Sequence, residues 1–280
     1  MPIEKPLPLM VGNKAYYSLT SYGPVEITID VPYTSDEDIE YSVAATIREM
    51  GGTEESLEDP AWLAEHFDGL TTKDQVYSAM RQELTHMGEQ LVEQQKASKC
   101  VEALGARLCQ SIPPMHLEQT KMAVRQRFID QLRAEGMTPE QFMERSGTSR
   151  AQLDTMLDQQ ALQMAEGSAA LSAYAHEKKL KVDEHEFGRL LGIPAEEVEG
   201  VISQARSVGQ YDDLREAALR SKAAQIVLAE CSCTYKHETP QEARMRMAQL
   251  RQMEQMYAQR FEDDQQDDAP ADNATGFKLV

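Results

Sequence analysis

Apolar and polar residues alternate early in the chain and recur at helical spacing in most of the remainder. Residues 25–31 alternate in the manner typical of a strand that buries one face. Residues 16–20 form a second strand-like run, and Gly23 and Pro24 supply turn chemistry between the two runs. The pattern therefore predicts an antiparallel β-hairpin near the N-terminus.

A helix is predicted over residues 35–50. Ser35 is a suitable N-cap, and three acidic residues follow it at the positive end of the helix dipole. One apolar stripe runs along this helix: Ile39, Val43, Ile47 and Met50. Gly51 and Gly52 then end the helix. The hairpin and the helix together form a small N-terminal segment, residues 1–57.

From Pro60 onward the apolar positions recur every three or four residues, which predicts a helical body over residues 58–237. Prolines, glycines and capping residues divide this body into helices. The predicted helices cover residues 60–67, 72–110, 115–135, 139–146, 149–181, a short helix ending at Gly192, 194–208 and 211–231. Residues 238–280 add a Gln-rich helix over 241–261 and a disordered acidic end that begins at Glu262. The predicted fold class is therefore mainly α.

The net charge of the chain limits the classes of molecule that it can bind. It carries 47 acidic and 28 basic residues, a formal net charge of −19. Because phosphates bind Lys and Arg, this balance argues against nucleic acid and anionic lipid as partners. No run approaches the ~20 apolar residues that cross a bilayer, and the N-terminus lacks the apolar core of a signal peptide. Four cysteines are too few for a disulfide scaffold, so we expect a cytoplasmic protein with reduced thiols and no membrane partner.

The sequence contains no strong catalytic motif. Cys231 and Cys233 with His237 are the best metal candidate, but a zinc knuckle needs two residues between its cysteines. Buried thiols on helices are the simpler interpretation. The histidines fit no metalloprotease motif, and the chain has no phosphate-binding glycine loop and no nucleophile elbow. We therefore expect neither an enzyme nor a metal or cofactor site.

Methionine is frequent, with 15 residues, whereas aromatic residues make up only 6%. Six methionines lie on the central helical segments and the turn between them: Met115, Met122, Met137, Met143, Met156 and Met164. Core packing is the simpler interpretation for any one of them. The alternative is an apolar surface that adapts to varied sequences, because an unbranched thioether side chain repacks easily. A few such side chains buried together would give an affinity of about 1 μM.

The order of several short segments is similar to that of a known family. Residues 62–233 resemble the C-terminal domain of trigger factor, the ribosome-associated bacterial chaperone. The similar segments are 67–76 (FDGLTTKDQV), 112–114 (IPP), 136–142 (GMTPEQF), 146–149 (SGTS), 180–186 (LKVDEHE) and 214–216 (LRE). The resemblance implies an elongated helical body, in which a long linker helix leads to two arms that enclose unfolded chain in an open cradle.

Two parts of the family pattern are missing from this sequence. The family has a basic Gly-Phe-Arg-x-Gly-Lys loop that docks on the ribosome, whereas residues 51–55 read GGTEE, which argues against that mode of ribosome docking. The family also has an FKBP-type prolyl isomerase domain of about 100 residues. Only two strand-like runs precede the helical part, so we expect no isomerase activity.

The resemblance implies an ATP-independent chaperone, or holdase, which binds extended apolar segments of unfolded or nascent polypeptides in the cleft between its arms. We expect the following residues to contact clients: Met122, Phe128, Met137, Phe142 and Met143 on the first arm, and Val198, Val201 and Ile202 on the second. Each of them is equally compatible with a place in the core.

Two other functions remain open at this point. The first is a dedicated interaction scaffold that holds one folded partner or a second copy of itself, with the helix over 241–261 as the docking element. The second is a residual prolyl isomerase in a degenerate N-terminal segment. Suppression of aggregation across unrelated proteins separates the chaperone from the scaffold, and a proline-limited refolding assay detects the isomerase.

Overall fold

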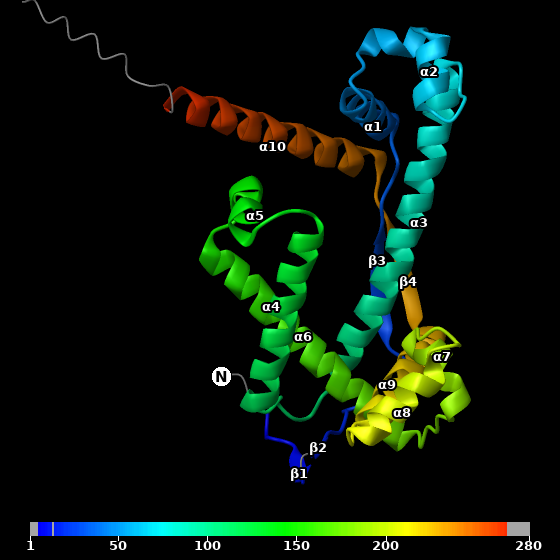
Figure 1. The fold of residues 1–280 in the computed structure, drawn as a ribbon, viewed down its shortest axis with the longest axis vertical. Coiled ribbons are helices and arrows are strands. Elements are labelled where there is room, and N and C mark those ends of the chain that lie inside the picture. Colours follow the sequence, from blue (N-terminus) through cyan, green and yellow to red (C-terminus); the bar gives the residue numbers. More distant parts are fainter. Residues whose placement is uncertain (1–4, 13, 268–280) are drawn as a thin grey trace, which may run out of the picture. The chain divides into compact units, whose positions relative to one another are not determined.

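A computed structural model of the chain describes residues 5–12 and 14–267, with side chains described as far as Met253 (Figure 1). The described chain is mainly helical, which confirms the predicted fold class. It divides into two compact units, Met1–Ile29 with Glu93–Thr234 and Asp30–Val92 with Tyr235–Val280. The segment boundaries at residues 57 and 237 stay a prediction. No helix in the described part of the chain is long and apolar enough to cross a membrane.

The second unit is built around α1 (Asp36–Glu49), which the sequence predicts. The Asp38 backbone N–H donates to the Ser35 hydroxyl at 3.1 Å, and the Ser35 N–H donates to the Asp38 carboxylate at 2.8 Å. This reciprocal pair is a capping box. Three further elements complete the unit's core: η1 (Glu54–Glu58), α2 (Pro60–His66) and the first turns of α3 (Lys73–Gly105). The core residues are Ile39, Val43, Ile47, Leu57, Leu63 and Val76.

Gly52 lets the turn after α1 pass close to the single tryptophan. A Cβ on Gly52 would lie 2.5 Å from the Trp62 ring, so no larger residue fits without a rearrangement. Trp62 stacks on His66, with 4.2 Å between the ring centroids and 15° between the ring planes. Gly52 is therefore required for packing as well as for ending the helix.

The last helix, α10 (Pro240–Asp267), packs on α1 within the second unit. Ala243 and Met247 on its first turns are buried. The helix runs through residues that the sequence assigns to a disordered acidic end, so that end does not begin at Glu262. The rest of the predicted acidic end, residues 268–280, lies outside the described residues.

The strands of the described chain pair differently from the predicted hairpin. They form two ladders: β1 (Leu9–Val11) with β2 (Lys14–Tyr16), and β3 (Glu26–Val31) with β4 (Ser232–His237). The predicted pairing of residues 16–20 with 25–31 is therefore wrong.

The end of α3 explains why the hairpin does not form. Leu19 makes a β-bridge with Leu108, and both side chains are buried. The Arg107 guanidinium donates to the Gly23 and Pro24 carbonyls at 2.6 and 2.8 Å. The turn residues therefore follow the end of α3 instead of reversing the chain, and β3 pairs elsewhere.

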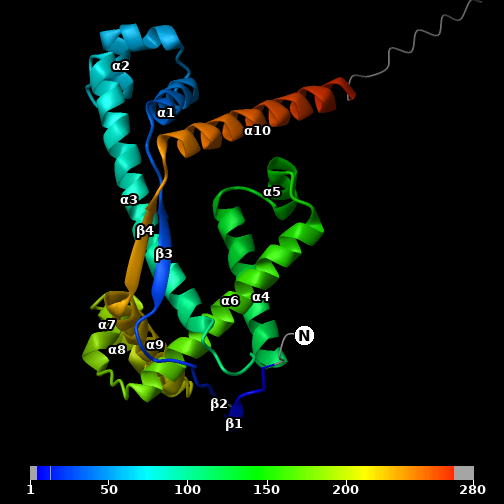
Figure 2. The ribbon, with the colours of Figure 1, turned by 180° about the vertical axis from the view of Figure 1, so that it is seen from behind.

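β3 and β4 lie side by side (Figure 2). The Ser232 N–H donates to the Val25 carbonyl at 2.8 Å, and the Glu238 N–H donates to the Val31 carbonyl at 2.9 Å. Because both partners advance along the sequence together, the two strands are parallel.

Two helical arms make up most of the first unit. The first arm consists of α4 (Pro114–Ala134), α5 (Pro139–Ser146) and α6 (Arg150–Glu177). The second consists of η2 (Glu184–Glu186), α7 (Phe187–Leu191), α8 (Val198–Ser207) and α9 (Tyr211–Glu230). In Figure 1 α6 runs from beside α4 to beside α9, and it packs on both, so it joins the arms.

Small residues let α6 pack closely on its neighbours. Several of them are buried along the helix: Ala161, Gly167, Ala169, Ala170, Ala173 and Ala175. A Cβ on Gly167 would lie 2.5 Å from Val101 Cγ1 of α3, which shows how near the two helices approach. The two arms therefore share one closely packed helix at their base.

Candidate functional site

The aromatic residues predicted on the first arm hold that arm together. Phe128 of α4 meets Phe142 of α5 edge-on, with ring centroids 5.3 Å apart and an interplanar angle of 83°. Both rings, together with Met143, pack against the buried residues of α4 and α6, which are Val124, Leu153, Leu157 and Ala161. These three predicted site residues are partly buried and contribute to the core of the arm. Their contact with a client stays a prediction.

Capping residues place α5 over this core. The Thr138 hydroxyl accepts from the Gln141 N–H at 3.2 Å, and the Gln141 side chain accepts from the Thr138 N–H at 2.9 Å. The Ser149 hydroxyl accepts from the Gln152 N–H at 3.3 Å and starts α6 in the same way. Met137, also a predicted site residue, is partly buried in the turn between α4 and α5.

Several methionines of the first arm are exposed. Met115 and Met122 lie seven residues apart on α4, hence on one face of the helix, and they are 67% and 63% exposed. On α6, Met156 and Met164 are also exposed. Met122 is the most exposed of the predicted site residues. Met115, Met156 and Met164 belong to the six methionines of the central helical segments but are not among the predicted client contacts.

A small groove lies at the base of the first arm, between the start of α4 and the middle of α6. Its volume is about 300 Å³. Ile112, His116 and Thr120 line one wall, Met164 and Ser168 line the other, and Tyr17 contributes from the N-terminal segment. The exposed Met164 therefore borders a depression and is not an isolated apolar side chain.

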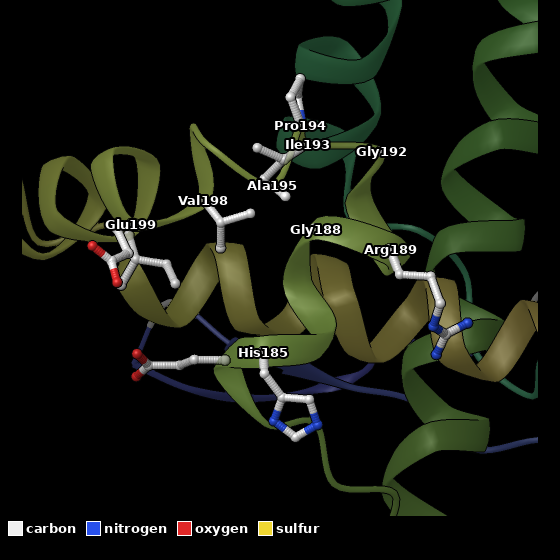
Figure 3. A pocket seen from close by; sticks show the side chains of 11 residues that line it. His185, Gly188, Arg189, Gly192, Ile193, Pro194, Ala195, Val198 and Glu199 are labelled. Atoms are coloured by element: carbon white, nitrogen blue, oxygen red, sulfur yellow. The ribbon is translucent and has the colours of Figure 1, made fainter.

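A larger pocket of about 790 Å³ lies in the second arm (Figure 3). Ile193, Pro194, Ala195, Val198 and Ile202 supply most of its apolar lining. Polar side chains supply much of the rest: Glu184, His185, Arg189 and Glu199. We call this the second-arm pocket. An apolar lining with a few charged groups is typical of a site that binds apolar side chains of a ligand.

Two of the three residues predicted on the second arm belong to this pocket. Val198 lines it and is half-buried, and Ile202 lines it but is only 6% exposed. Ile202 also joins the core of the second arm with Phe187, Leu190 and Ala218. Val201 is partly buried and does not line the pocket.

Glycines shape the pocket, although they are not among the site residues predicted from the sequence. Gly192 ends α7 with a left-handed backbone, φ 68°, which turns the chain toward Ile193 and Pro194. A Cβ on Gly188 would lie 3.0 Å from Val198 Cγ2 and 3.2 Å from the Ile193 carbonyl oxygen. The spacing Gly188, Gly192, Pro194 is the signal in the sequence that points to this tight loop.

Polar contacts fix the short helices beside the pocket. The Tyr211 hydroxyl donates to Glu184 at 2.8 Å, and Arg206 pairs with Glu184 while lying over the Tyr211 ring at 4.8 Å. The hydrogen bond to Glu184 raises the pKa of Tyr211. Lys222 holds Glu186 at 2.9 Å, and a backbone hydrogen bond from Asp183 followed by this lysine contact lowers the pKa of Glu186.

The predicted metal candidate is not assembled in the structure. Cys231 ends α9 and Cys233 lies in β4, and not on a helix as the simpler interpretation supposes. His237, in the second unit, is exposed. Among the described residues, no group of three or more His, Cys, Asp and Glu side chains is arranged to hold a metal ion.

Comparison with known protein families finds a match that covers most of the helical part of the chain. The family described as bacterial trigger factor protein C-terminus matches residues 72–229, more than half of the chain. No curated protein matches the chain. The matched range contains both arms, the second-arm pocket and the exposed methionines of α4 and α6.

Proposed function

The chain belongs to the family of the bacterial trigger factor C-terminus, a chaperone family, and from this premise we propose that it acts as an ATP-independent holdase. It binds extended apolar segments of unfolded or nascent polypeptides on its two arms. The observation that carries the proposal is the second-arm pocket, which lies in the same unit as the exposed methionines of the first arm.

The energetics of these surfaces suit weak and reversible binding. Burial of one apolar side chain contributes about 1.5–3 kcal/mol. A pocket of about 790 Å³ accepts a few such side chains of an extended segment. After the cost of ordering the client, the remaining free energy corresponds to an affinity of about 1 μM. A holdase needs such an affinity because it must release its client.

Charge supports a role in keeping clients soluble. The net charge of −19 makes complexes of this protein repel one another, which opposes aggregation of the bound client. We place the protein in the cytoplasm, where nascent chains are found. Clients bind without nucleotide, in keeping with a sequence that contains no phosphate-binding glycine loop.

Light scattering by several unrelated unfolding proteins tests the proposal. The wild-type protein is expected to suppress aggregation of all of them. Met115→Glu with Met122→Glu weakens suppression, because it places charge on the exposed face of α4. Met50→Glu with Met87→Glu is the matched control, because both methionines are exposed in the second unit. Suppression of one client only, or of none, contradicts the proposal.

The second-arm pocket is tested separately by filling it. Ala195 is exposed and lines the pocket, so Ala195→Trp is expected to occupy the space without disturbing the core. Client affinity should fall about 10-fold, which corresponds to ~1.4 kcal/mol. Val208→Trp, on the same arm but outside the pocket, is the control. Equal affinity for both variants would remove the pocket from the proposed site.

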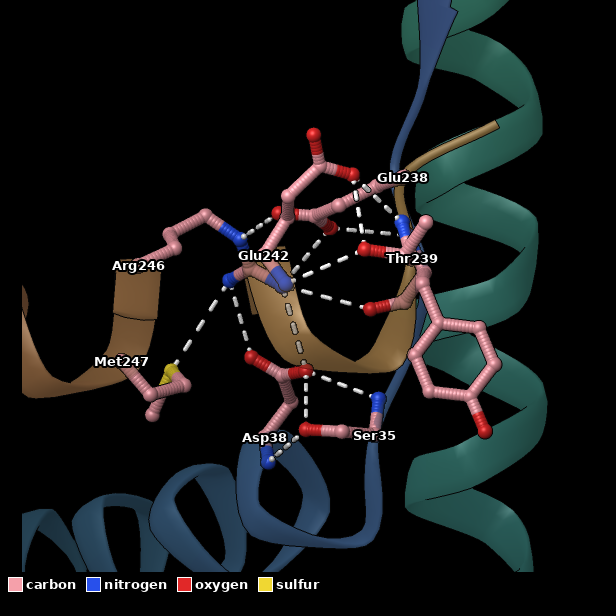
Figure 4. A network of polar contacts seen from close by, with 8 residues as sticks. Ser35, Asp38, Glu238, Thr239, Glu242, Arg246 and Met247 are labelled. Atoms are coloured by element: carbon pink, nitrogen blue, oxygen red, sulfur yellow. Dashed lines mark hydrogen bonds and ion pairs between the residues drawn. The ribbon is translucent and has the colours of Figure 1, made fainter. Parts of the chain in front are cut away.

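The last helix supports the scaffold as a second candidate function. Met245, Leu250 and Met253 of α10 are exposed. Arg246 anchors the helix through hydrogen bonds to Asp38 at 2.9 Å and Glu238 at 3.0 Å (Figure 4). If this apolar face holds one dedicated partner or a second copy, Leu250→Glu with Met253→Glu abolishes that complex and leaves general aggregation suppression unchanged.

We also propose that the chain lacks prolyl isomerase activity and the family's usual mode of ribosome docking. The acidic residues Glu54 and Glu55 are exposed at the start of η1, a position that offers no basic loop. A proline-limited refolding assay and ribosome co-sedimentation test these two statements. A catalysed refolding rate, or salt-sensitive ribosome binding, would overturn the corresponding statement.

A further inference from the structure

Three cysteine thiols come together where α3, α9 and β4 meet in the first unit. Cys231 is the C-cap of α9, Cys233 lies in β4, and their sulfur atoms are 3.2 Å apart. Cys100 of α3 is buried, at 1% exposure, and lies near Cys231. None of the cysteines forms a disulfide in the described part of the chain.

The strand explains why two of these thiols face each other. The backbone of Cys231 is extended, with φ −62° and ψ 144°, and leads directly into β4. Because side chains alternate along an extended chain, Cys231 and Cys233 point to one side and Ser232 points to the other. The hydrogen bond from the Ser232 N–H to the Val25 carbonyl, at 2.8 Å, holds this orientation. The Cys231 thiol also contacts the Leu228 carbonyl at 3.1 Å, which keeps its sulfur near Cys233.

The surroundings distinguish the third thiol from the other two. Burial, and then the contact with Cys231, raise the pKa of Cys100 to about 12, so its thiol stays protonated near neutral pH. Cys231 and Cys233 are only partly buried, so a small oxidant can reach them. Because thiolates and not thiols attack disulfides, Cys100 is unsuited to start an exchange.

We propose that Cys231 and Cys233 form a reversible thiol–disulfide site that reacts with small-molecule disulfides such as oxidised glutathione. One protein thiolate attacks a sulfur of oxidised glutathione, forms a mixed disulfide and releases one glutathione thiolate. The second protein thiolate then attacks the protein sulfur of the mixed disulfide and displaces the other glutathione. In the balance, two protein thiols are oxidised to one disulfide, and one oxidised glutathione is reduced to two glutathione molecules.

Peptide mapping of the full-length protein tests this proposal directly. The reduced protein is incubated with oxidised glutathione, its remaining thiols are alkylated, and it is digested with trypsin. Cys231 and Cys233 lie together on the peptide 223–236, between Lys222 and Lys236, whereas Cys100 and Cys109 fall on two other peptides. The expected product is the peptide 223–236 lacking two hydrogen atoms and both alkyl groups, and dithiothreitol restores the alkylated form.

Single substitutions show whether the disulfide depends on Cys231 and Cys233 and not on the other two cysteines. Cys231→Ser and Cys233→Ser are expected to abolish the internal disulfide, while Cys100→Ser and Cys109→Ser leave it in place. Circular dichroism confirms that each variant is folded. The proposal is overturned if the wild-type peptide acquires only glutathione adducts, if it stays reduced, or if a disulfide links it to the peptide that carries Cys100.

Discussion

At the residue scale, Phe128 and Met122 lie on the same helix, α4, but have different environments. Phe128 is partly buried against the first-arm core and meets Phe142 edge-on, whereas Met122 is 63% exposed. Both are expected client contacts from the sequence, where a large apolar residue on a helix has the same pattern in either environment. The structure therefore separates a side chain that packs in the core of the arm from one that is exposed to solvent.

Phe128→Ala is expected to lower the free energy of unfolding by about 2–3 kcal/mol, below the 3–5 kcal/mol of a fully buried ring. Met122→Ala on the same helix should cost less than about 0.5 kcal/mol, because the side chain is exposed. Urea denaturation of both variants measures the difference. Equal losses would show that the environments of the two side chains are alike in solution.

The environment of the Asp38 carboxyl predicts that the free energy of unfolding depends on pH. Burial raises the pKa of this carboxyl, but hydrogen bonds from Arg246 and Ser35 outweigh burial and hold the pKa below its usual value of 3.8. A lowered pKa in the folded state stabilises the protein above the unfolded-state pKa, and the contribution is lost as the pH falls through the folded-state pKa.

The stability difference between the wild type and Asp38→Asn should therefore be full above about pH 5 and should shrink steadily below about pH 4. Asp36→Asn is the control, because Asp36 is exposed and its ion pair with Arg81, at 2.6 Å, lies on the surface. Urea unfolding at several pH values measures both. A difference for Asp38→Asn that does not change with pH contradicts the assigned cause.

At the element scale, local sequence signals predicted the helices well. Ser35 caps the helix that the sequence assigns to it, and Gly192 ends α7 as expected. Thr138 and Ser149 cap α5 and α6 at the predicted starts of these helices. Such caps act within one turn, so they can be read from a few adjacent residues. The pairing of β3 with β4 has no such local signal, because its two strands are far apart in the sequence.

Substitution by alanine is expected to change stability in opposite directions at two helical glycines. Gly167→Ala should destabilise the first unit by about 1–3 kcal/mol, because its Cβ would lie 2.5 Å from Val101 Cγ1. Gly200→Ala in α8 should stabilise by about 0.5–1 kcal/mol, because no atom lies within 4 Å of the added carbon. Thermal unfolding followed by circular dichroism compares them. A stabilising Gly167→Ala would show that α6 and α3 are not closely packed there.

At the scale of the whole molecule, the helical fold class follows from apolar spacing, but the composition of the two units does not. Each unit combines segments from distant parts of the chain. The site shows the same limit: Val198 and Ile202 carry an apolar pattern, while Gly188, Gly192 and Ile193 join them only through the loop that the fold creates. The spacing of apolar residues predicts which residues share one face of a helix. It does not predict which residues a turn brings together.

Truncation after Pro240 is expected to destabilise the second unit. It removes the buried Ala243 and Met247 and the hydrogen bonds of Arg246. Trp62, the single tryptophan, lies in that unit, so its fluorescence reports the unfolding of the second unit. The midpoint should fall by several degrees. Truncation after Met253, which keeps these three residues, is the control, and identical midpoints for both truncations would contradict the expectation.

The parallel pairing of β3 with β4 has a consequence for synthesis of the chain on the ribosome. The hydrogen bond between Val25 and Ser232 cannot form until Ser232 has been synthesised, more than two hundred residues after Val25. At a translation rate of 5–20 residues per second, this delay lasts about 10–40 s. During that interval the buried faces of Ile27 and Ile29 have no strand partner. A protein that we propose to bind unfinished chains therefore itself exposes an unpaired apolar strand while it is being synthesised.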